Sequence, residues 1–248
     1  MLTVSRRVVI IPTYNEIENI ESIVRAVFTQ PNVFDILIVD DGSPDGTGAM
    51  IVQLQKEFPE KLFLLERTGK LGLGTAYITG FRWALEKNYD YILEMDADFS
   101  HPPAKLNELL EKCETGQSDL AVGSRYVKGG GVVNWPFIRL ALSRGASMYV
   151  QLITGMGIKD PTAGFVCYSR KVLESIDLSQ IKFVGYAFQI EMKYAAYRLG
   201  FKLCEVPIIF PDRQKGKSKM NILIIREALT GVFAMRFLHS YKRYVLNK

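Results

Sequence analysis

The sequence predicts an α/β fold with a mostly parallel central sheet flanked by helices, and three observations lead to this prediction. Short apolar runs rich in β-branched residues alternate with longer segments of helical periodicity through the first half of the 248-residue chain, which is the pattern of βαβ repetition. Hydrophobic residues make up 48% and charged residues 23% of the chain, an ordinary globular composition that excludes disorder, collagen and coiled coil. The length suits one large domain, or one domain with a C-terminal appendage.

Strands are expected where short β-branched runs occur, and helices where apolar residues recur every three to four positions. In the first half, strands are expected at residues 8–11, 36–39, 62–65, 91–95 and 120–122, and helices at residues 17–28, 47–58, 75–86 and 104–114. The less regular second half is expected to hold a helix at 138–154, a strand at 165–168, a helix at 187–199 and a strand at 203–209. Functional loops of such a sheet gather at the carboxyl ends of the strands.

The composition shifts after the last expected strand. Residues 212–219 are rich in Lys and Arg, an apolar-rich helix is expected over residues 221–238, and a basic tail follows. Apolar side chains in this helix recur at helical spacing, with basic residues beside them, so it either lies at a membrane interface or packs on the core. We therefore expect one main domain over residues 1–219 and a C-terminal amphipathic helix over residues 220–248.

Several classes of protein are excluded at this stage. Three widely spaced cysteines without a C-x-x-C pair (Cys113, Cys167 and Cys204) argue against a disulfide framework and against a thiolate zinc site. The longest uncharged stretch, residues 145–158, is shorter than the roughly 20 residues that a spanning helix needs, and the N-terminus does not resemble a secretory signal. The formal net charge of +5 allows an anionic partner, and nucleic acid is not among the partners that we expect.

The fourth expected strand ends in Asp96-Ala97-Asp98. Residues two apart face the same side of extended chain, so both carboxylates can address one hard divalent cation such as Mg²⁺ or Mn²⁺. Two carboxylates on one face repel each other unless a cation lies between them, and a plain capping loop is the alternative interpretation. The two histidines, His101 and His239, are too far apart in sequence to indicate a metal pair, and we expect both to be structural.

The first two expected strands also end in polar loops. Pro12-Thr13-Tyr14-Asn15-Glu16 offers an aromatic ring on which a base could lie, although a plain βα turn fits as well. Asp40-Asp41-Gly42-Ser43-Pro44-Asp45-Gly46 begins like a calcium loop, but Val52 stands where an EF-hand needs Glu. Its first carboxylates could instead accept hydrogen bonds from a ribose or a base.

Basic residues follow in three places. Arg125 comes directly after the fifth strand, and Arg139 and Ser143 lie four residues apart in one expected helix, so that both could grip one phosphate; a solvated basic face is the alternative. Arg213 and Lys219 bracket Gly216 in the basic loop, which would suit a lid over a diphosphate. Glu191 is a carboxylate within an apolar helix, where it either orders the site or lies at the surface.

The ordered set of motifs resembles the dolichol-phosphate (polyprenol-phosphate) mannose synthases of glycosyltransferase family 2. The motifs that carry the resemblance are residues 12–16, 40–47, 70–77, 95–101 and 123–126, and the match continues through residues 143–146, 160–165 and 205–208. The resemblance implies a GT-A fold, an inverting transfer of mannose from GDP-mannose to a polyprenyl phosphate, and a Mg²⁺ or Mn²⁺ cofactor. It also implies a cytoplasmic protein that is peripheral on the cytoplasmic face of a membrane, and that a small membrane-anchoring subunit could assist.

The resemblance also implies roles for individual residues. Asp98, Arg125, Arg139 and Ser143 would be catalytic, with Arg139 and Ser143 holding the acceptor phosphate, and Asp96 and Asp98 would hold the metal. Some relatives carry Gln where this chain has Ser100, so the identity of a third metal ligand stays open. The nucleotide sugar would contact Pro12, Tyr14, Glu16, Val39, Asp41, Asp96, Ala97, Asp98, Arg125, Arg213 and Lys219.

Three alternatives stay open from the sequence. The same fold could use another nucleotide sugar, such as UDP-glucose, or another acceptor. A processive synthase is disfavoured because the chain has no Q-x-x-R-W motif. A non-catalytic nucleotide-sugar-binding subunit is the alternative from a different class, and the intact set of Asp96, Asp98 and Arg125 argues against it.

Overall fold

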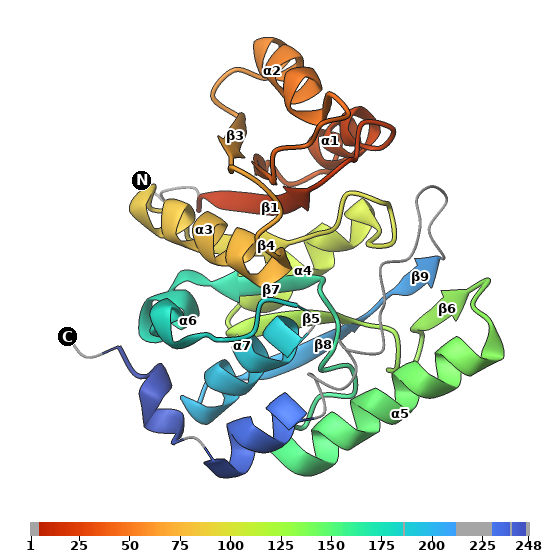
Figure 1. The fold of residues 1–248 in the computed structure, drawn as a ribbon, viewed down its shortest axis with the longest axis vertical. Helices are drawn as coiled ribbons and strands as arrows, with labels where there is room; N and C mark the ends of the chain where they lie inside the picture. Colours follow the sequence, from red (N-terminus) through yellow and green to blue (C-terminus); the bar gives the residue numbers. More distant parts are fainter. Residues whose placement is uncertain (1–4, 186, 212–229, 239, 247–248) are drawn as a thin grey trace.

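A seven-stranded sheet forms the centre of the molecule in the computed structural model, which describes residues 5–185, 187–211, 230–238 and 240–246 (Figure 1). The strand order is β3-β2-β1-β4-β7-β5-β8. The strands are β1 (Arg7–Thr13), β2 (Asp35–Asp40), β3 (Leu62–Glu66), β4 (Tyr91–Glu94), β5 (Leu120–Ser124), β7 (Val166–Ser169) and β8 (Leu203–Pro207). All neighbours pair in parallel except β7, which is antiparallel to both β4 and β5. The prediction of a mostly parallel α/β sheet is confirmed.

Helices cover both faces of the sheet because the strand residues alternate between two cores. Val8 and Ile10 of β1 belong to one core, and Val9 and Ile11 belong to the other, as the two-residue period of a strand requires. Helices α3 (Leu73–Glu86), α5 (Phe137–Thr154), α6 (Arg170–Ser175) and α7 (Ala187–Arg198) contribute to the first core, and α1 (Ile20–Phe28), α2 (Thr47–Glu57) and α4 (Leu106–Glu114) to the second.

Several elements differ from the sequence-based expectation. The helix expected from residue 17 begins at Ile20, because the carbonyl of Glu16 accepts the N–H groups of Asn19 and Ile20 in a preceding turn. The strand expected over residues 203–209 is divided, and its end forms β9 (Ile209–Pro211), which pairs in parallel with β6 (Gly131–Val133) in a separate ribbon. Short 3₁₀ turns at η1 (Pro103–Lys105) and η2 (Leu178–Gln180) and the helix α6 were not expected.

The C-terminal amphipathic helix is described only in part. Residues 212–229 lie outside the described part of the chain, and so does the expected domain boundary at 219–220. Residues 230–233 are helical, Ala234–Leu238 continue as a π-helix, and Tyr241–Tyr244 form the 3₁₀ turn η4. Val232 and Met235 are buried in the core, whereas Phe233 and Phe237 are exposed. The described end of this segment therefore packs on the domain with one side.

Within the described ranges, the structure contains no helix that is both long enough and apolar enough to cross a membrane.

Candidate active site

The carboxyl ends of β1, β2 and β4 meet at one edge of the sheet. β1 lies between β2 and β4 and is parallel to both. Thr13 at the end of β1 pairs with Asp40, and the carbonyl of Thr13 accepts the N–H of Asp41 at 3.0 Å. The N–H of Met95 reaches the carbonyl of Ile10 on the other side of β1 at 3.1 Å. The polar loops predicted from sequence are therefore neighbours in space.

Asp40 organises the loop that follows β2. Its buried carboxylate accepts the hydroxyl of Thr13 at 2.7 Å and both the N–H and the hydroxyl of Ser43, at 2.8 and 2.6 Å. The hydroxyl of Ser43 in turn accepts the N–H of Asn15 at 2.9 Å, and Asn15 has a positive φ of 59°. Asp40 thereby fixes the loop after β1 against the loop after β2. The carboxylate of the next residue, Asp41, takes no part in these bonds and has a different partner.

Asp41 is held by Arg67, a residue that sequence reasoning missed. The Arg67 Nε donates to Asp41 Oδ1 at 2.6 Å, and the other guanidinium nitrogens donate to the Thr75 hydroxyl and the Gly72 carbonyl. Both partners of the ion pair are about nine-tenths buried. Their separation of 26 residues explains why no local pattern predicted the pair.

The remaining residues expected at the nucleotide line the same loops. Pro12 lies beside buried Val39 in the β1–β2 register. The Lys70 ammonium lies 5.1 Å from the centre of the Tyr14 ring, a cation–π contact that fixes this ring at the edge of the site. The Glu16 N–H donates to the Thr47 hydroxyl at 3.0 Å. The five predicted residues Pro12, Tyr14, Glu16, Val39 and Asp41 are brought together.

The Asp96-Ala97-Asp98 loop leaves β4 at the same edge. The Asp96 side chain is one-third exposed, whereas Asp98 and Ala97 are buried. Asp98 Oδ1 accepts the N–H of Ser100 at 3.1 Å, and Phe99 between them has a positive φ of 61°. This tight turn directs the loop back on itself and presents its two carboxylates near the strand end.

His101 holds this loop in place, a role more specific than the structural one expected. Its Nδ1 accepts the backbone N–H of Asp96 at 3.0 Å, so this nitrogen carries no proton in the bonded form. The imidazole is buried and stacks on Phe165 with ring centres 5.0 Å apart. The orientation of the first carboxylate therefore depends on a histidine five residues away.

The donor set suits a hard divalent cation. Among the described residues no group of three His, Cys, Asp or Glu side chains forms a ready-made metal cage. Mg²⁺ and Mn²⁺ are commonly held by one or two carboxylates together with waters and substrate phosphates, which is what Asp96 and Asp98 can provide at an open strand end.

Two buried ionisable residues, Glu94 and Lys193, lie close to the loop. Glu94 is fully buried, and burial raises its pKa to about 8, against the attraction of Lys193, which lowers it. Lys193 is buried as well, and burial lowers its pKa to about 8. Its ammonium donates to the Ala163 carbonyl at 2.6 Å and to the Gln189 carbonyl at 2.9 Å. Lys193 thereby links α7 to the loop that follows Asp160.

Arg125 makes a bidentate ion pair with Asp160. Its Nε and one terminal nitrogen lie 2.7 and 2.6 Å from the two carboxylate oxygens, and its backbone N–H donates to the same group at 3.0 Å. The Asp160 side chain is completely buried and Arg125 is 10% exposed. Desolvation lowers the pKa of Arg125, but the bonds to Asp160 raise it and prevail, so the guanidinium stays charged. Sequence reasoning assigned Arg125 to phosphates and missed this partner.

An aromatic cluster of His101, Phe210 and Trp135 connects Arg125 with the loop that carries Asp96 and Asp98. The Arg125 guanidinium lies 5.5 Å from the centre of the Phe210 ring and 5.7 Å from that of Trp135. Phe210 packs edge-on against His101, with ring centres 5.6 Å apart. Asp96, His101, Phe210 and Arg125 thus form a continuous series of contacts.

The same cluster extends to the residues expected at the acceptor. The Arg139 guanidinium stacks on Trp135 at 3.9 Å, and the Tyr126 hydroxyl donates to Ser143 at 2.6 Å or accepts from it. Both Arg139 and Ser143 project from α5, four residues apart as expected. Arg213 and Lys219, expected in the closing loop, lie outside the described residues.

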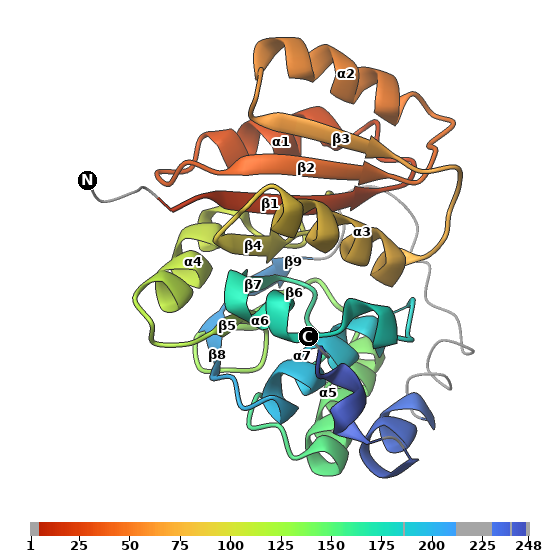
Figure 2. The same cartoon turned by 90° about the vertical axis from the view of Figure 1, so that its left-hand side faces the viewer.

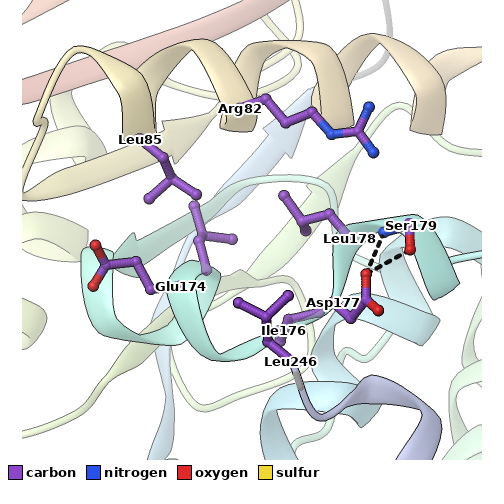
Figure 3. A pocket seen from close by; sticks show the side chains of 9 residues that line it. Arg82, Leu85, Glu174, Ile176, Asp177, Leu178, Ser179 and Leu246 are labelled. Atoms are coloured by element: carbon purple, nitrogen blue, oxygen red, sulfur yellow. Dashed lines mark hydrogen bonds between the residues drawn. The ribbon is translucent and has the colours of Figure 1, made fainter. Parts of the chain in front are cut away.

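The cavity shown in Figure 3 does not belong to this site. It has a volume of about 300 Å³ and lies between the C-terminal half of α3, α6 and the C-terminal segment, with Arg82, Leu178 and Leu246 in its walls. α6 follows the end of β7 that pairs with the start of β4. The cavity is therefore at the opposite edge of the sheet.

Solved structures share this architecture. Glucosyl-3-phosphoglycerate synthase from Mycobacterium tuberculosis, solved with Mn²⁺, UDP and glucosyl-3-phosphoglycerate, superposes with a TM-score of 0.68 at 18% identity, over 94% of this chain and 80% of that one. A mannosyltransferase from Pyrobaculum calidifontis, solved with GDP-mannose and Mn²⁺, gives a TM-score of 0.63 at 18% identity, over 96% of this chain and 66% of that one. The fold is the GT-A fold of glycosyltransferases.

The sequence comparisons give the family. The model of glycosyl transferase family 2 matches residues 8–177. Polyprenol monophosphomannose synthase from Mycolicibacterium smegmatis is 50% identical over 90% of this chain and 84% of its own length. Undecaprenyl-phosphate mannosyltransferase from Micrococcus luteus is 45% identical over 92% of each chain. The chain belongs to glycosyl transferase family 2 and is a hexosyltransferase.

Proposed function

We propose that this protein transfers mannose from GDP-mannose to a polyprenyl phosphate, with inversion at the anomeric carbon, giving polyprenyl phosphate mannose and GDP. The observation that carries the proposal is the continuous series of contacts from Asp96 through His101 and Phe210 to Arg125. This series joins the carboxylates that suit a cation to the guanidinium that suits a phosphate. The names of the two relatives, at 50% and 45% identity, support mannose and a polyprenyl phosphate as the reacting partners.

The donor occupies the edge formed by β1, β2 and β4 in this proposal. Tyr14 offers a face for the base, and Asp41, oriented by Arg67, accepts hydrogen bonds from the nucleoside. Asp96 and Asp98 would hold Mg²⁺ or Mn²⁺ together with the diphosphate. When bound, the cation would neutralise the charge that grows on the departing GDP. Arg213 and Lys219 keep their expected role in closing over the diphosphate.

The acceptor needs no general base. A phosphate monoester is already anionic near pH 7, so the protein must align it and offset its charge. Arg139, stacked on Trp135, supplies a preformed guanidinium, and Ser143 supplies a hydroxyl oriented by Tyr126. Arg125 is fixed by Asp160, and it contributes positive charge to the site between the two substrates.

A membrane-facing position follows from α5, the helix that carries Arg139 and Ser143. Its side chains Phe137, Ile138, Leu142, Met148 and Leu152 are 62% to 83% exposed, and helical geometry puts them on one side of the helix. Figure 1 shows α5 along the part of the molecule farthest from β3. An exposed apolar stripe of this kind suits a lipid surface, so we infer that α5 lies in the interface. The protein is then peripheral on the cytoplasmic face, with or without a small anchoring subunit.

A second candidate donor is UDP-glucose. The glucosyl-3-phosphoglycerate synthase with the same fold was solved with this sugar nucleotide and Mn²⁺, although it shares only 18% identity with the chain. The two much more similar relatives are named for mannose transfer, which favours GDP-mannose.

Extraction of labelled lipid tests the proposal. Purified protein is incubated with undecaprenyl phosphate, Mg²⁺ or Mn²⁺, and either radiolabelled GDP-mannose or UDP-glucose, and label is counted in the organic phase. Transfer from GDP-mannose, absent with UDP-glucose, is the expected result. Transfer from UDP-glucose alone would overturn the assignment of GDP-mannose as the donor. No transfer from either sugar nucleotide, by folded protein that still binds GDP, would favour a non-catalytic subunit.

A further inference from the structure

Glu191 is a buried carboxylate that the reaction described above does not use. It lies on α7, is completely buried, and accepts four hydrogen bonds. Its Oε1 accepts from Arg243 at 2.6 Å and from the Tyr244 hydroxyl at 3.1 Å, and its Oε2 accepts the backbone N–H groups of Lys182 and Phe183 at 2.8 and 3.0 Å. A buried carboxylate is costly unless it is paired and hydrogen-bonded. Glu191 therefore fastens three segments to one another.

The first of these segments is the C-terminal segment, residues 240–246. Tyr244 is buried, its ring packs edge-on against Tyr194 of α7, and its carbonyl accepts the N–H of Asp177 at 2.9 Å. Val245 forms an antiparallel bridge with Ile176. Figure 2 shows the dark-blue C-terminal segment near α6 and α7. The ion pair between Arg243 and Glu191 is thus part of a docked structure and not a loose surface contact.

The second segment is the loop of residues 181–185, which packs against the N-terminus of α3. The N–H of Gly74 donates to the Val184 carbonyl at 2.8 Å. A Cβ on Gly74 would lie 2.7 Å from the Phe183 carbonyl, and a Cβ on Gly72 would lie 3.1 Å from that of Val184. Glycine is required at these positions because the loop approaches so closely.

The N-terminus of α3 leads directly to the nucleotide edge. Arg67 donates to the Gly72 carbonyl at 3.3 Å and to the Thr75 hydroxyl at 2.8 Å, and it pairs with Asp41. Hydrogen bonds, joined by one or two residues of backbone in the 181–185 loop and at the start of α3, therefore connect Arg243 through Glu191 to Arg67. Rigid hydrogen-bonded elements of this kind can carry energetic coupling between distant sites.

We propose that Glu191 is a positioning residue for the nucleotide. It holds the 181–185 loop against α3, keeps Arg67 and Asp41 in the orientation that receives the donor, and makes this orientation depend on the docked C-terminal segment. The inference rests on the proposed function, since it assigns Asp41 to a nucleoside diphosphate. It predicts that breaking the ion pair between Arg243 and Glu191 weakens donor binding, whereas the rate of the chemical step changes little.

Calorimetric titration of the full chain with GDP and Mn²⁺ tests the proposal. Arg243→Met and Glu191→Gln are expected to weaken GDP binding and to raise the donor KM about tenfold, with kcat changed less than about twofold. Arg243→Lys, which keeps the charge, should recover part of the affinity. Arg7→Met is the matched control, because Arg7 is as buried as Arg243 and pairs with Glu114 at the start of β1, away from Glu191, the C-terminal segment and the 181–185 loop. The GDP affinity of this variant should equal that of the wild type.

A double-mutant cycle separates positioning from a merely structural role. In an Arg67→Met background, Arg243→Met should weaken GDP binding no further, because the path runs through Arg67. Additive effects, or unchanged GDP affinity in folded Arg243→Met and Glu191→Gln proteins, would overturn the inference alone. Failure of the wild type to bind either GDP or UDP would instead overturn the proposed function, and this inference with it.

Discussion

Single residues at the centre of the site depend on buried charges that neutralise each other. Asp160→Asn leaves the guanidinium of Arg125 buried without its counter-charge, which should lower the free energy of unfolding by about 3 kcal/mol or more. Urea unfolding followed by circular dichroism measures this loss. Glu174→Gln, which breaks a half-exposed ion pair with Arg170, is the control and should cost no more than about 0.5 kcal/mol. Equal losses in both variants would contradict the account.

Buried Glu94 and Lys193 predict an unusual dependence of stability on pH. Between pH 4.5 and about 8, folded Glu94 binds a proton that the unfolded chain has released, so the free energy of unfolding falls as pH rises. Between about 8 and 10.5 the unfolded chain keeps the Lys193 proton that the folded state has lost, and stability rises again. Urea unfolding in EDTA from pH 5 to 10 should show a minimum near pH 8. Glu94→Gln should remove the fall on the acidic side, and an unchanged fall in that variant would refute the assignment.

Local sequence patterns point to the candidate site residues, but not to the residues that hold those side chains in place. Asp96 and Asp98 follow from an i, i+2 pattern at a strand end, and Arg139 and Ser143 follow from an i, i+4 pattern on one helix. Arg67 and Asp160 pair with Asp41 and Arg125 across 26 and 35 residues. No local period encodes such pairs, because loops from different strands make them.

At the scale of elements, α5 is the part of the fold that we expect to meet lipid. The double variant Phe137→Ser/Leu152→Ser removes two side chains that are more than 80% exposed, and should weaken binding to phosphatidylglycerol-containing vesicles at least about tenfold. Co-sedimentation with the vesicles measures the binding, and circular dichroism checks that the variant is folded.

The control for this experiment comes from the far end of the molecule. Val33→Ser/Val52→Ser removes two exposed valines that lie near α1 and on α2, and it should leave vesicle binding unchanged. Full vesicle binding by the α5 variant would contradict the inference that α5 lies in the membrane interface. Absence of binding by the wild type would contradict direct lipid contact and favour an anchoring subunit.

The alternation of strands and helices was predicted because hydrophobic periodicity reports local burial. The antiparallel direction of β7 and the division between β8 and β9 were not predicted, since strand direction depends on how the chain returns to the sheet. The apolar side of α5 was equally hidden, because periodicity identifies an apolar face without telling whether protein or lipid covers it.

At the scale of the whole molecule, the strand order brings the two halves of the site together. β1, β2 and β4 carry the loops assigned to the donor, α5 carries the residues assigned to the acceptor, and Arg125 at the end of β5 is assigned to the space between the two substrates. β7 lies between β4 and β5. The aromatic cluster of His101, Phe210 and Trp135 connects the loop after β4 with the residues near Arg125. The GT-A fold thus supplies one edge at which two phosphate-bearing substrates can meet.

The most direct test of this account is mannose transfer by Asp98→Asn. In the extraction assay with GDP-mannose, undecaprenyl phosphate and Mn²⁺, wild-type transfer should disappear on chelation, and Asp98→Asn should reduce it at least about 100-fold while the protein stays folded. Asp119→Asn, at the opposite edge of the sheet where the carboxylate pairs with Lys171, should transfer like the wild type. Undiminished transfer by Asp98→Asn, or by the wild type in excess EDTA, would contradict the central claim that this edge binds the metal and the diphosphate.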